Sequence, residues 1–331
     1  WDQLYVRFGM GVLMKKFHIC FYITLFFISA CSDFKGNEDD VEASLSSTPS
    51  SNSNTTNTSY KNLNAVTFGN NTFIAVGRNG VMRSSSDNGS TWDNVTSGTT
   101  RELKEVAFGN NTFVSVGQRG TIRYSEDNGS SWNAGTWSGN SNLYGIAFGN
   151  DTFVALNSNF IRSTDNGSNW ETKSTANLSD LAFGNSTFIS CGASGTIYLS
   201  TDNGSGWSTS NSGTTNSLND ITFGGNQFFS VGNGGTIVKS ADNGSSWNSV
   251  TVPAEHSTTT FNSIIYGNNK FLVIGRNAVL VSSDNGSTFP EKENTLTFND
   301  VTYGNGLFVA VGNNEIIYTS TDGDTWTKVH P

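Results

Sequence analysis

Apolar and polar positions follow a pattern along this chain that returns every 37 to 42 residues. Each copy opens with an apolar-x-x-apolar-x-aromatic-Gly segment, as in residues 63–69, and a nearly all-apolar run such as 72–77 follows an Asn-rich turn. Two further short segments complete the copy. The last two segments alternate with a period of two, as in residues 120–125, which predicts β-strands, and the Asn and Gly residues between the segments predict tight turns. Later copies open at Leu103, Leu143, Leu178, Leu218, Phe261 and Phe298, which makes seven in all.

Seven copies of four short strands predict one all-β domain over residues 61–331, a seven-bladed β-propeller with four antiparallel strands per blade. Sheets that are covered on both faces explain why the first two strands of each copy are nearly all apolar. The last copy ends on a fourth strand, at residues 326–329. We therefore expect blade 7 to close the ring by packing against blade 1, without exchange of a strand.

The third and fourth strands of each copy flank the segment Ser-x-Asp-Asn-Gly-x-x-Trp, first present at residues 85–92. Asn and Gly tolerate the positive φ of a hairpin turn, and the carboxylate can accept N–H bonds from that turn. The indole ring can bury a large area against the hairpin. Phe289 replaces Trp in the sixth copy, and the seventh copy is one residue shorter. The aspartates of the motif are Asp87, Asp127, Asp165, Asp202, Asp242, Asp284 and Asp322.

This motif, in seven copies at the spacing of propeller blades, resembles the Asp-box (BNR) repeat of sialidases and many other β-propellers. In that family the motif stabilises the hairpin between the third and fourth strands, away from any active site. The resemblance therefore implies a structural role for the seven aspartates. The whole propeller also resembles the sialidase-like propellers and the photosystem II stability/assembly factor family, whose members bind membrane-protein intermediates through an Arg-rich face.

The first 60 residues lack the repeat. Met14-Lys15-Lys16 predicts the start of translation, so we expect residues 1–13 to be a non-native upstream extension. The apolar run that follows is short for a membrane span and fits a signal peptide over residues 14–30. The run ends in Ile28-Ser29-Ala30-Cys31, which resembles the bacterial lipobox, in which the cysteine is lipidated. An ordinary signal peptide with a chance cysteine is the alternative.

The Ser/Thr/Asn-rich residues 31–60 offer little to bury and predict a flexible tether. The resemblance to the lipobox implies a lipoprotein of the bacterial cell envelope, anchored to a membrane through Cys31, with the propeller facing the periplasm or the exterior. The net charge of −9 argues against a nucleic-acid partner. We expect a monomer with no cofactor and no metal.

A binding site should break the sevenfold symmetry. The connection between blades 5 and 6, residues 252–257, departs most from its counterparts and contains Glu255 and His256. The connection between blades 2 and 3 contains Trp137, whose ring suits stacking on a sugar or a peptide. The alternatives are solvated loop residues for Glu255 and His256, and a ring packed under its own loop for Trp137. Arginines in second-to-third turns on the same face give three more candidates, Arg78, Arg119 and Arg276.

Acidic side chains form a second pattern, at the third position of the opening strand in four of the seven copies. First strands line the channel of a propeller, so these carboxylates could ring its mouth and attract a cation. The alternative is that they cap the incoming turn of each blade. The four residues are Glu105, Asp180, Asp220 and Asp300.

These features favour an extracytoplasmic, lipid-anchored propeller without enzymatic activity, a binding or assembly scaffold for protein or glycan partners of the envelope or the exterior. The alternative is a glycoside hydrolase, either sialidase-like or another two-carboxylate glycosidase. A sialidase requires an Arg triad, and the Arg-Ile-Pro signature of that family is absent from the sequence. A two-carboxylate glycosidase requires carboxyl groups about 5–10 Å apart, which the channel acids could supply. We assign no catalytic residue.

Overall fold

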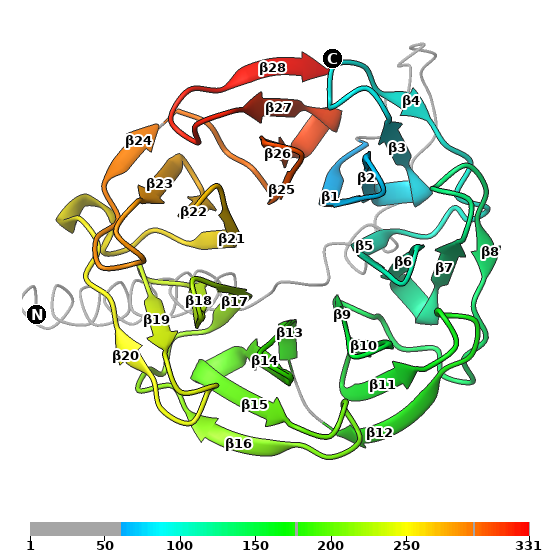
Figure 1. Ribbon diagram of the computed structural model, residues 1–331, viewed down its shortest axis with the longest axis horizontal. Coiled ribbons are helices and arrows are strands. Elements are labelled where there is room, and N and C mark those ends of the chain that lie inside the picture. Colours follow the sequence, from blue (N-terminus) through cyan, green and yellow to red (C-terminus); the bar gives the residue numbers. More distant parts are fainter. Residues whose placement is uncertain (1–60, 176–177, 294, 331) are drawn as a thin grey trace, which may run out of the picture. The chain divides into compact units, whose positions relative to one another are not determined.

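The computed structural model describes residues 61–175, 178–293 and 295–330. The expectations for the extension 1–13, the signal peptide 14–30, lipidated Cys31 and the tether 31–60 lie outside the described residues. The described residues form seven four-stranded antiparallel sheets around a central axis (Figure 1). The prediction of an all-β, seven-bladed β-propeller with four antiparallel strands per blade is confirmed.

Each blade consists of four consecutive strands, and the first strand lies nearest the axis (Figure 1). Blade 1 contains β1 (Leu63–Gly69), β2 (Thr72–Gly77), β3 (Met82–Ser85) and β4 (Asp93–Asn94). Blade 2 contains β5 (Leu103–Gly109), β6 (Thr112–Gly117), β7 (Ile122–Ser125) and β8 (Asn133–Ala134). Blade 3 contains β9 (Gly145–Gly149), β10 (Thr152–Leu156), β11 (Asn159–Ser163) and β12 (Glu171–Thr175). Blade 4 contains β13 (Leu178–Gly184), β14 (Thr187–Gly192), β15 (Thr196–Ser200) and β16 (Ser208–Asn211).

The remaining blades repeat this arrangement. Blade 5 contains β17 (Leu218–Gly224), β18 (Gln227–Gly232), β19 (Ile237–Ser240) and β20 (Asn248–Ser249). Blade 6 contains β21 (Phe261–Gly267), β22 (Lys270–Gly275), β23 (Ala278–Ser282) and β24 (Glu291–Glu293), and blade 7 contains β25 (Asp300–Gly304), β26 (Leu307–Val311), β27 (Ile317–Ser320) and β28 (Thr327–His330). Short 3-10 turns are η2 (Arg78–Gly80), η3 (Gln118–Gly120), η4 (Ala193–Gly195), η5 (Ala254–His256) and η6 (Asn313–Glu315). Within the described ranges, no helix has the length and apolar character needed to cross a membrane.

The hydrophobic core lies between the blades. In blade 1, β2 is buried at every position. Its side chains point alternately to the two faces of the sheet. Ile74 and Val76 contact blade 2, whereas Phe73 and Ala75 contact blade 7. A cluster of this kind fills each of the seven interfaces. Burial of both faces explains why the second strands are apolar throughout.

An aromatic residue and a glycine at the end of each first strand join neighbouring blades. The ring of Phe108 in blade 2 lies over Gly69 in blade 1, so that a Cβ atom added to Gly69 would be 2.1 Å from Cγ of the ring. Only a glycine permits this approach. The contact recurs at all seven interfaces, in the pairs Gly69–Phe108, Gly109–Phe148, Gly149–Phe183, Gly184–Phe223, Gly224–Tyr266, Gly267–Tyr303 and Gly304–Phe68.

The ring closes where blade 7 meets blade 1. The Leu63 N–H donates to the Gly312 carbonyl at 3.1 Å, and Asn299 Nδ2 donates to the Leu63 carbonyl at 2.8 Å. Within the described part of the chain, the sheet of blade 7 contains β25 to β28. Packing of blade 7 against blade 1 is therefore observed, whereas the absence of strand exchange stays a prediction, because the chain before residue 61 lies outside the described residues.

The hairpin between the third and fourth strands is held by the repeated motif. In blade 1, Ser85 Oγ donates to Asp87 Oδ1 at 2.8 Å and accepts the Gly89 N–H at 2.9 Å. The N–H of Thr91 donates to the same carboxylate at 3.0 Å, and Trp92 Nε1 donates to the Gly89 carbonyl at 3.2 Å. Bonds from the Thr91 side chain and backbone, and then from Ser85, lower the pKa of Asp87 to about 2. The carboxylate therefore organises its own turn.

Gly109→Ala should lower the free energy of unfolding by about 3 kcal/mol, the upper part of the range for overpacking, because its Cβ would be 2.0 Å from Cγ of Phe148. Urea unfolding of the purified chain measures the change. Gly213→Ala is the control: nothing lies within 4 Å of its added Cβ, and its φ of +75° limits the cost to roughly 1 kcal/mol of backbone strain. Equal losses in the two variants would contradict the role assigned to the aromatic–glycine contact.

Candidate functional site

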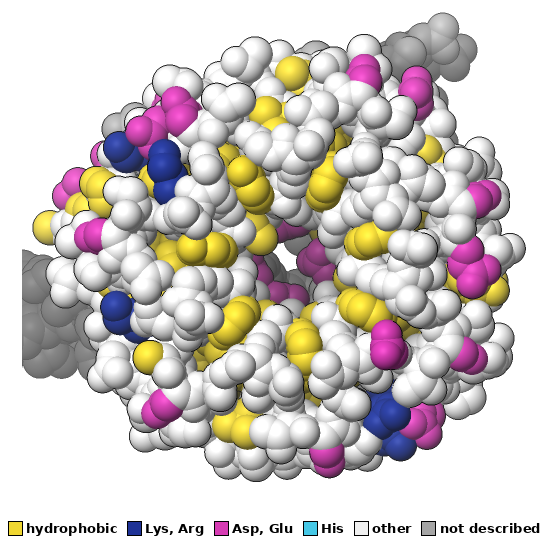
Figure 2. All heavy atoms as spheres, viewed as in Figure 1, with side chains coloured by type: hydrophobic (Ala, Val, Ile, Leu, Met, Phe, Trp, Pro, Cys, Tyr) yellow, Lys and Arg dark blue, Asp and Glu magenta, His cyan; other side chains and the backbone are white. Residues whose placement is uncertain are grey.

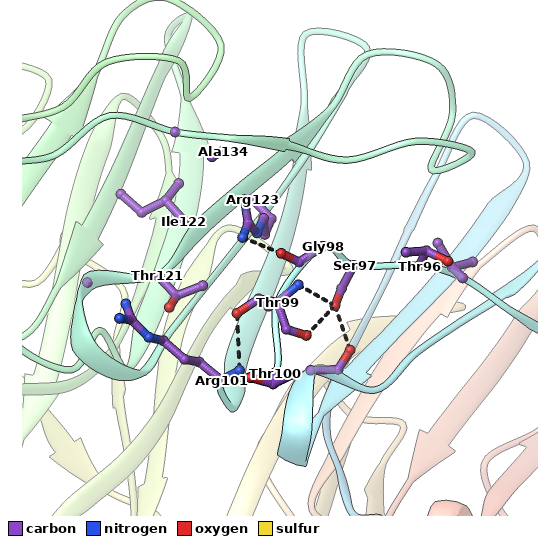
Figure 3. A pocket seen from close by; sticks show the side chains of 14 residues that line it. Thr96, Ser97, Gly98, Thr99, Thr100, Arg101, Thr121, Ile122, Arg123 and Ala134 are labelled. Atoms are coloured by element: carbon purple, nitrogen blue, oxygen red, sulfur yellow. Dashed lines mark hydrogen bonds between the residues drawn. The ribbon is translucent and has the colours of Figure 1, made fainter.

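An open hollow of about 790 Å³ lies between blades 1 and 2. Its walls come from the connection between β4 and β5, from the start of β7 with the turn before it, and from the end of β8 (Figure 3). Gly80, the last residue of η2, adds only backbone. The lining residues are Gly80, 95–101, 120–123 and 134–135.

The connection between β4 and β5 is held in place by a buried serine. Ser97 Oγ donates to the Gly80 carbonyl at 2.7 Å and accepts the Thr99 N–H at 3.4 Å (Figure 3). Between blades 4 and 5, Ser212 Oγ donates to the Gly195 carbonyl at 2.6 Å in the same manner. The backbone of the hollow therefore belongs to the repeated architecture, and its special character comes from the side chains that it carries.

Arg123 supplies a partly buried positive charge to the hollow. Its Nη2 donates to the Gly98 carbonyl at 2.6 Å (Figure 3). Its Nε is buried and has no hydrogen-bond partner within the described part of the chain. Burial, and then the charge of Arg101, lower the pKa of Arg123. A guanidinium remains charged at neutral pH and has five N–H donors, so Arg123 keeps donors available for a ligand.

The equivalent arginine of the neighbouring interface shows what is missing at Arg123. Arg83 occupies the same position in β3, two residues before the serine of the motif. Its Nη1 donates to Asn94 Oδ1, and its Nη2 forms a buried ion pair with Glu315 of blade 7. The Nζ atom of Lys61 also lies 3.7 Å from Glu315 Oε1. The guanidinium of Arg83 is thus satisfied within the protein.

Both acceptors of Arg83 are replaced at the interface between blades 1 and 2. Ala134 stands opposite Arg123 in the sheet, at the position where Asn94 stands opposite Arg83. Gly80 occupies the turn position that Glu315 occupies in blade 7. Glu315 has a φ of 59° and Gly80 a φ of 70°, so the two turns share one backbone conformation. Ala134 and Gly80 both line the hollow, which therefore lies where an amide and a carboxylate are found at the neighbouring interface.

The arginines predicted from the sequence lie at different distances from this hollow. Arg119 lies at its edge, because Arg101 Nη1 donates to the Arg119 carbonyl at 3.1 Å. Arg78 lies in η2, the turn that supplies Gly80. Arg276 is exposed in the turn between β22 and β23 of blade 6, across the ring (Figure 1). The structure therefore places the backbone of Arg119, but not Arg276, beside the hollow.

Trp137 is held by its own loop. A Cβ added to Gly139 would be 2.2 Å from the indole ring, and one added to Gly120 would be 3.1 Å from it. The indole Nε1 donates to Thr172 Oγ1 in β12 at 3.2 Å. The ring packs against the cluster between blades 2 and 3. This placement favours the structural alternative for Trp137 over sugar stacking.

The connection between blades 5 and 6 places its two candidates differently. Glu255 is exposed, whereas His256 is 4 % exposed and lies with Nε2 3.2 Å from Glu291 Oε1 at the start of β24. The alternative of a solvated loop residue is therefore wrong for His256. Burial follows from the packing of its ring near Phe261, at 6.3 Å between ring centroids.

The acidic residues of the first strands surround the axis, and acidic side chains are visible around the central opening in Figure 2. Asp220 Oδ2 accepts the N–H of Ile264, in the first strand of blade 6, at 2.6 Å. Asp300 Oδ2 accepts the N–H of Val66, in the first strand of blade 1, at 2.8 Å. These carboxylates cap N–H groups of the next blade's first strand, and not an incoming turn.

Asp180 and Glu105 also accept backbone N–H bonds, but the bond to Asp180 is longer and the bond to Glu105 comes from the next residue in its own strand. Asp180 Oδ2 accepts the Ile221 N–H at 3.4 Å, and Glu105 Oε1 accepts the Val106 N–H at 3.0 Å. Burial, and then the charge of Asp220, raise the pKa of Asp300 to about 7. The same two causes raise the pKa of Asp180 well above its usual value. Some of these carboxyl groups are therefore protonated near neutral pH.

Arg101, Arg123 and Gly80 were not among the residues singled out from the sequence. The signal for them lies in a comparison of equivalent repeat positions. Arginine occupies the position two before the motif serine in blades 1 and 2, and glutamate aligns with Gly80 in blade 7 alone. Only the structure shows that these three positions meet across an interface between blades.

A family model described as photosynthesis system II assembly factor YCF48 matches residues 206–292. This chain is similar to the YCF48 propellers. A solved structure of YCF48 bound to D1 peptide has a TM-score of 0.65 at 20% identity, covering 78% of this chain and 91% of that one. The expected resemblance to the photosystem II stability/assembly factors is confirmed.

Two further solved structures support the fold. YCF48 from Cyanidioschyzon merolae has a TM-score of 0.64 at 13% identity and covers 78% of this chain and 94% of that one. The computationally designed Ika8 protein has a TM-score of 0.57 at 12% identity, and the match covers 82% of this chain and 96% of that one. At these identities the likeness establishes the propeller architecture. No curated protein matches the sequence.

The channel acids predict a specific pH dependence. A carboxyl group whose pKa rises from 3.8 to about 7 on folding stabilises the fold fully at low pH and loses that contribution as the pH rises through about 7. Asp300→Asn should therefore abolish a decline in the free energy of unfolding on the order of 3 kcal/mol between pH 4 and pH 7.5. Urea titrations at several pH values measure this.

Asp242→Asn is the matched control for this titration, because hydrogen bonds from the Ser246 side chain and backbone lower the pKa of Asp242 to about 2. Its contribution is lost as the pH falls, so the slope above pH 4 should match the wild type. An unchanged slope in Asp300→Asn would contradict the assignment to Asp300.

Proposed function

We propose that this protein is a non-enzymatic binding and assembly propeller that takes a carboxylate of a partner protein into the hollow between blades 1 and 2. The observation that carries the proposal is the difference between Arg123 and Arg83. Arg83 has its carboxylate in Glu315, whereas Arg123 faces Gly80 at the equivalent place. A carboxylate from a partner would complete the arrangement that the protein itself completes one interface away.

The chemistry of the hollow suits an acidic side chain or a C-terminal carboxylate. Arginine pairs with carboxylates through parallel N–H bonds, and partial burial strengthens such a pair. Arg101 adds a second positive charge at the same wall. The Gly98 carbonyl and the hydroxyl groups of Thr99 and Thr121 offer polar groups to a peptide backbone beside the carboxylate. A volume of about 790 Å³ accommodates a few residues of an extended segment.

Similarity to the YCF48 propellers supports a protein partner. The solved relative named above is bound to a peptide. An assembly role for this chain is the corresponding proposal, with a segment of an envelope or extracellular protein as the ligand. The channel carboxylates accept backbone N–H bonds between blades, which favours architecture over the hydrolytic alternative.

The proposed location is the bacterial cell envelope. The segment Ile28-Ser29-Ala30-Cys31 at the end of an apolar run supports a lipoprotein signal with lipidation at Cys31, and residues 31–60 would act as a tether. The seven Ser-x-Asp hairpins support the assignment to Asp-box propellers. A monomeric propeller on such an anchor would present the hollow to proteins at the membrane surface.

Peptide selection tests the proposal. A pooled library of random hexapeptides is offered to the immobilised full chain, with half of the pool ending in a free carboxylate and half in an amide. Mass spectrometry of the retained peptides should show at least tenfold enrichment of carboxylate-bearing sequences over amides that lack acidic residues. Loss of a hydrogen-bonded charge pair costs about 1.5–3 kcal/mol, so Arg123→Gln should remove this enrichment.

Two variants make the selection specific to the hollow. Ala134→Asn supplies the internal acceptor that Asn94 gives to Arg83, and it should weaken carboxylate capture severalfold. Arg276→Gln removes an equally charged, exposed arginine in blade 6 and should leave the enrichment unchanged. Equal enrichment by the wild type and Arg123→Gln, or loss of enrichment in Arg276→Gln, would overturn the assignment.

A further inference from the structure

The connection between blades 5 and 6 is a rigid element of this propeller. The His256 N–H donates to the Pro253 carbonyl at 2.9 Å, and the Thr259 N–H donates to the His256 carbonyl at 3.0 Å. The Gly235 N–H of blade 5 donates to the Thr259 carbonyl at 2.7 Å. The backbone around His256 is therefore held against blade 5, and the side chain has a defined direction.

That direction brings His256 to two carboxylates from different elements. Glu255 precedes it in η5, and Glu291 begins β24 of blade 6. One ligand atom from each of the three side chains lies within 4.8 Å of the other two. The imidazole is buried, Glu291 is partly buried and Glu255 is exposed, so the group has a closed side and a side open to solvent.

The imidazole has one nitrogen with a neighbouring hydroxyl and one without a hydrogen bond. Nδ1 lies 3.3 Å from Thr259 Oγ1. Donation from Nδ1 to this hydroxyl leaves the lone pair on Nε2, the state in which a histidine binds a metal. Nε2 is buried and makes no hydrogen bond within the described residues, although Glu291 Oε1 is only 3.2 Å away. A cation between the two atoms would bind both this lone pair and the carboxylate oxygen that faces it.

The spacing matches a tetrahedral zinc site. Zinc binds imidazole nitrogen and carboxylate oxygen at about 2.0–2.2 Å, which places two ligand atoms of a tetrahedron roughly 3.3 Å apart. The distance from His256 Nε2 to Glu291 Oε1 is 3.2 Å. Lys292, the next residue, is engaged by Asp324 at 3.1 Å. Rotation of the exposed Glu255 side chain would bring in the third ligand.

We propose that Glu255, His256 and Glu291 bind a divalent cation of the Zn²⁺ class. One imidazole and two carboxylates suit zinc better than calcium, which prefers a shell of oxygen ligands. The ion would connect the blade 5–6 connection to the outermost strand of blade 6 and keep a fourth position open on the exposed side. This site is separate from the hollow between blades 1 and 2.

Metal titration of the full chain tests this site. Chelator-treated protein is titrated with ZnCl₂ by calorimetry, and CoCl₂ is added separately to record the visible absorption of tetrahedral Co²⁺. The wild type should bind one Zn²⁺ through this site and show the Co²⁺ band. His256→Gln should lose both signals, and Glu255→Gln and Glu291→Gln should weaken binding at least tenfold.

The variants also separate ligand loss from misfolding. Glu255 is exposed, so Glu255→Gln preserves the fold and remains decisive where His256→Gln unfolds. His330→Gln is the control, because among the described residues its Nε2 is paired with one carboxylate, that of Glu315 at 3.9 Å, and its removal should leave binding unchanged. Absence of Zn²⁺ binding by the wild type, or equal affinity in the wild type and Glu255→Gln, would overturn the proposal.

Discussion

The contact on which this structure depends is that of an aromatic ring lying over a glycine of the preceding blade. It occurs at all seven interfaces, including Gly304–Phe68, where the two ends of the propeller meet. A ring carbon about 2 Å from where a Cβ would stand sets the distance between first strands at a value that no other residue permits. Equal spacing at seven interfaces closes the circle, and the apolar second strands then fill the space between the blades.

The seven interfaces share one backbone arrangement, so a binding site at one of them arises from side chains that differ from those at equivalent positions. Arg83 and Arg123 occupy the same position in neighbouring blades, but only Arg83 meets an asparagine and a glutamate. At the closing interface, Glu315 occupies a left-handed backbone position at which η2, η3 and η4 have glycine, and its ion pair with Arg83 connects blade 7 to blade 1. At the interface between blades 1 and 2, the asparagine and the glutamate are both absent, and a hollow lies beside the charge of Arg123. The same architecture therefore serves closure at one interface and recognition at the next.

The sequence was sufficient to predict the propeller, the number of blades and the hairpins, because their signals are local and repeat seven times. The aromatic–Gly ending of each first strand was visible as a pattern, but its partner lies about 40 residues away in the next blade. The acids of the first strands were found for the same reason as the hairpins. Their partners, such as the Val66 N–H for Asp300, depend on the closed ring and could not be read from spacing.

The candidate sites were less predictable than the fold. The hollow at Arg123 depends on the absence of acceptor side chains that are present at the equivalent positions of the neighbouring interface. Arg123 looks ordinary in the sequence until Gly80 and Ala134 are compared with Glu315 and Asn94. The departure of the 252–257 connection from its counterparts did draw attention to His256, although burial of the ring and the approach of Glu291 required three dimensions. Composition and pattern therefore located the asymmetric loops, while the chemistry in them depends on contacts between blades.

The most direct test of the central claim compares the two arginines in one spectrum. Nε–H resonances of Arg83 and Arg123 can be followed by ¹H–¹⁵N NMR while acetate is added to the full chain. We expect a saturable shift at Arg123 and no shift at Arg83, whose guanidinium is already paired with Glu315. Parallel shifts at both residues, or no shift at Arg123 at high acetate concentration, would contradict the claim that the hollow receives a carboxylate.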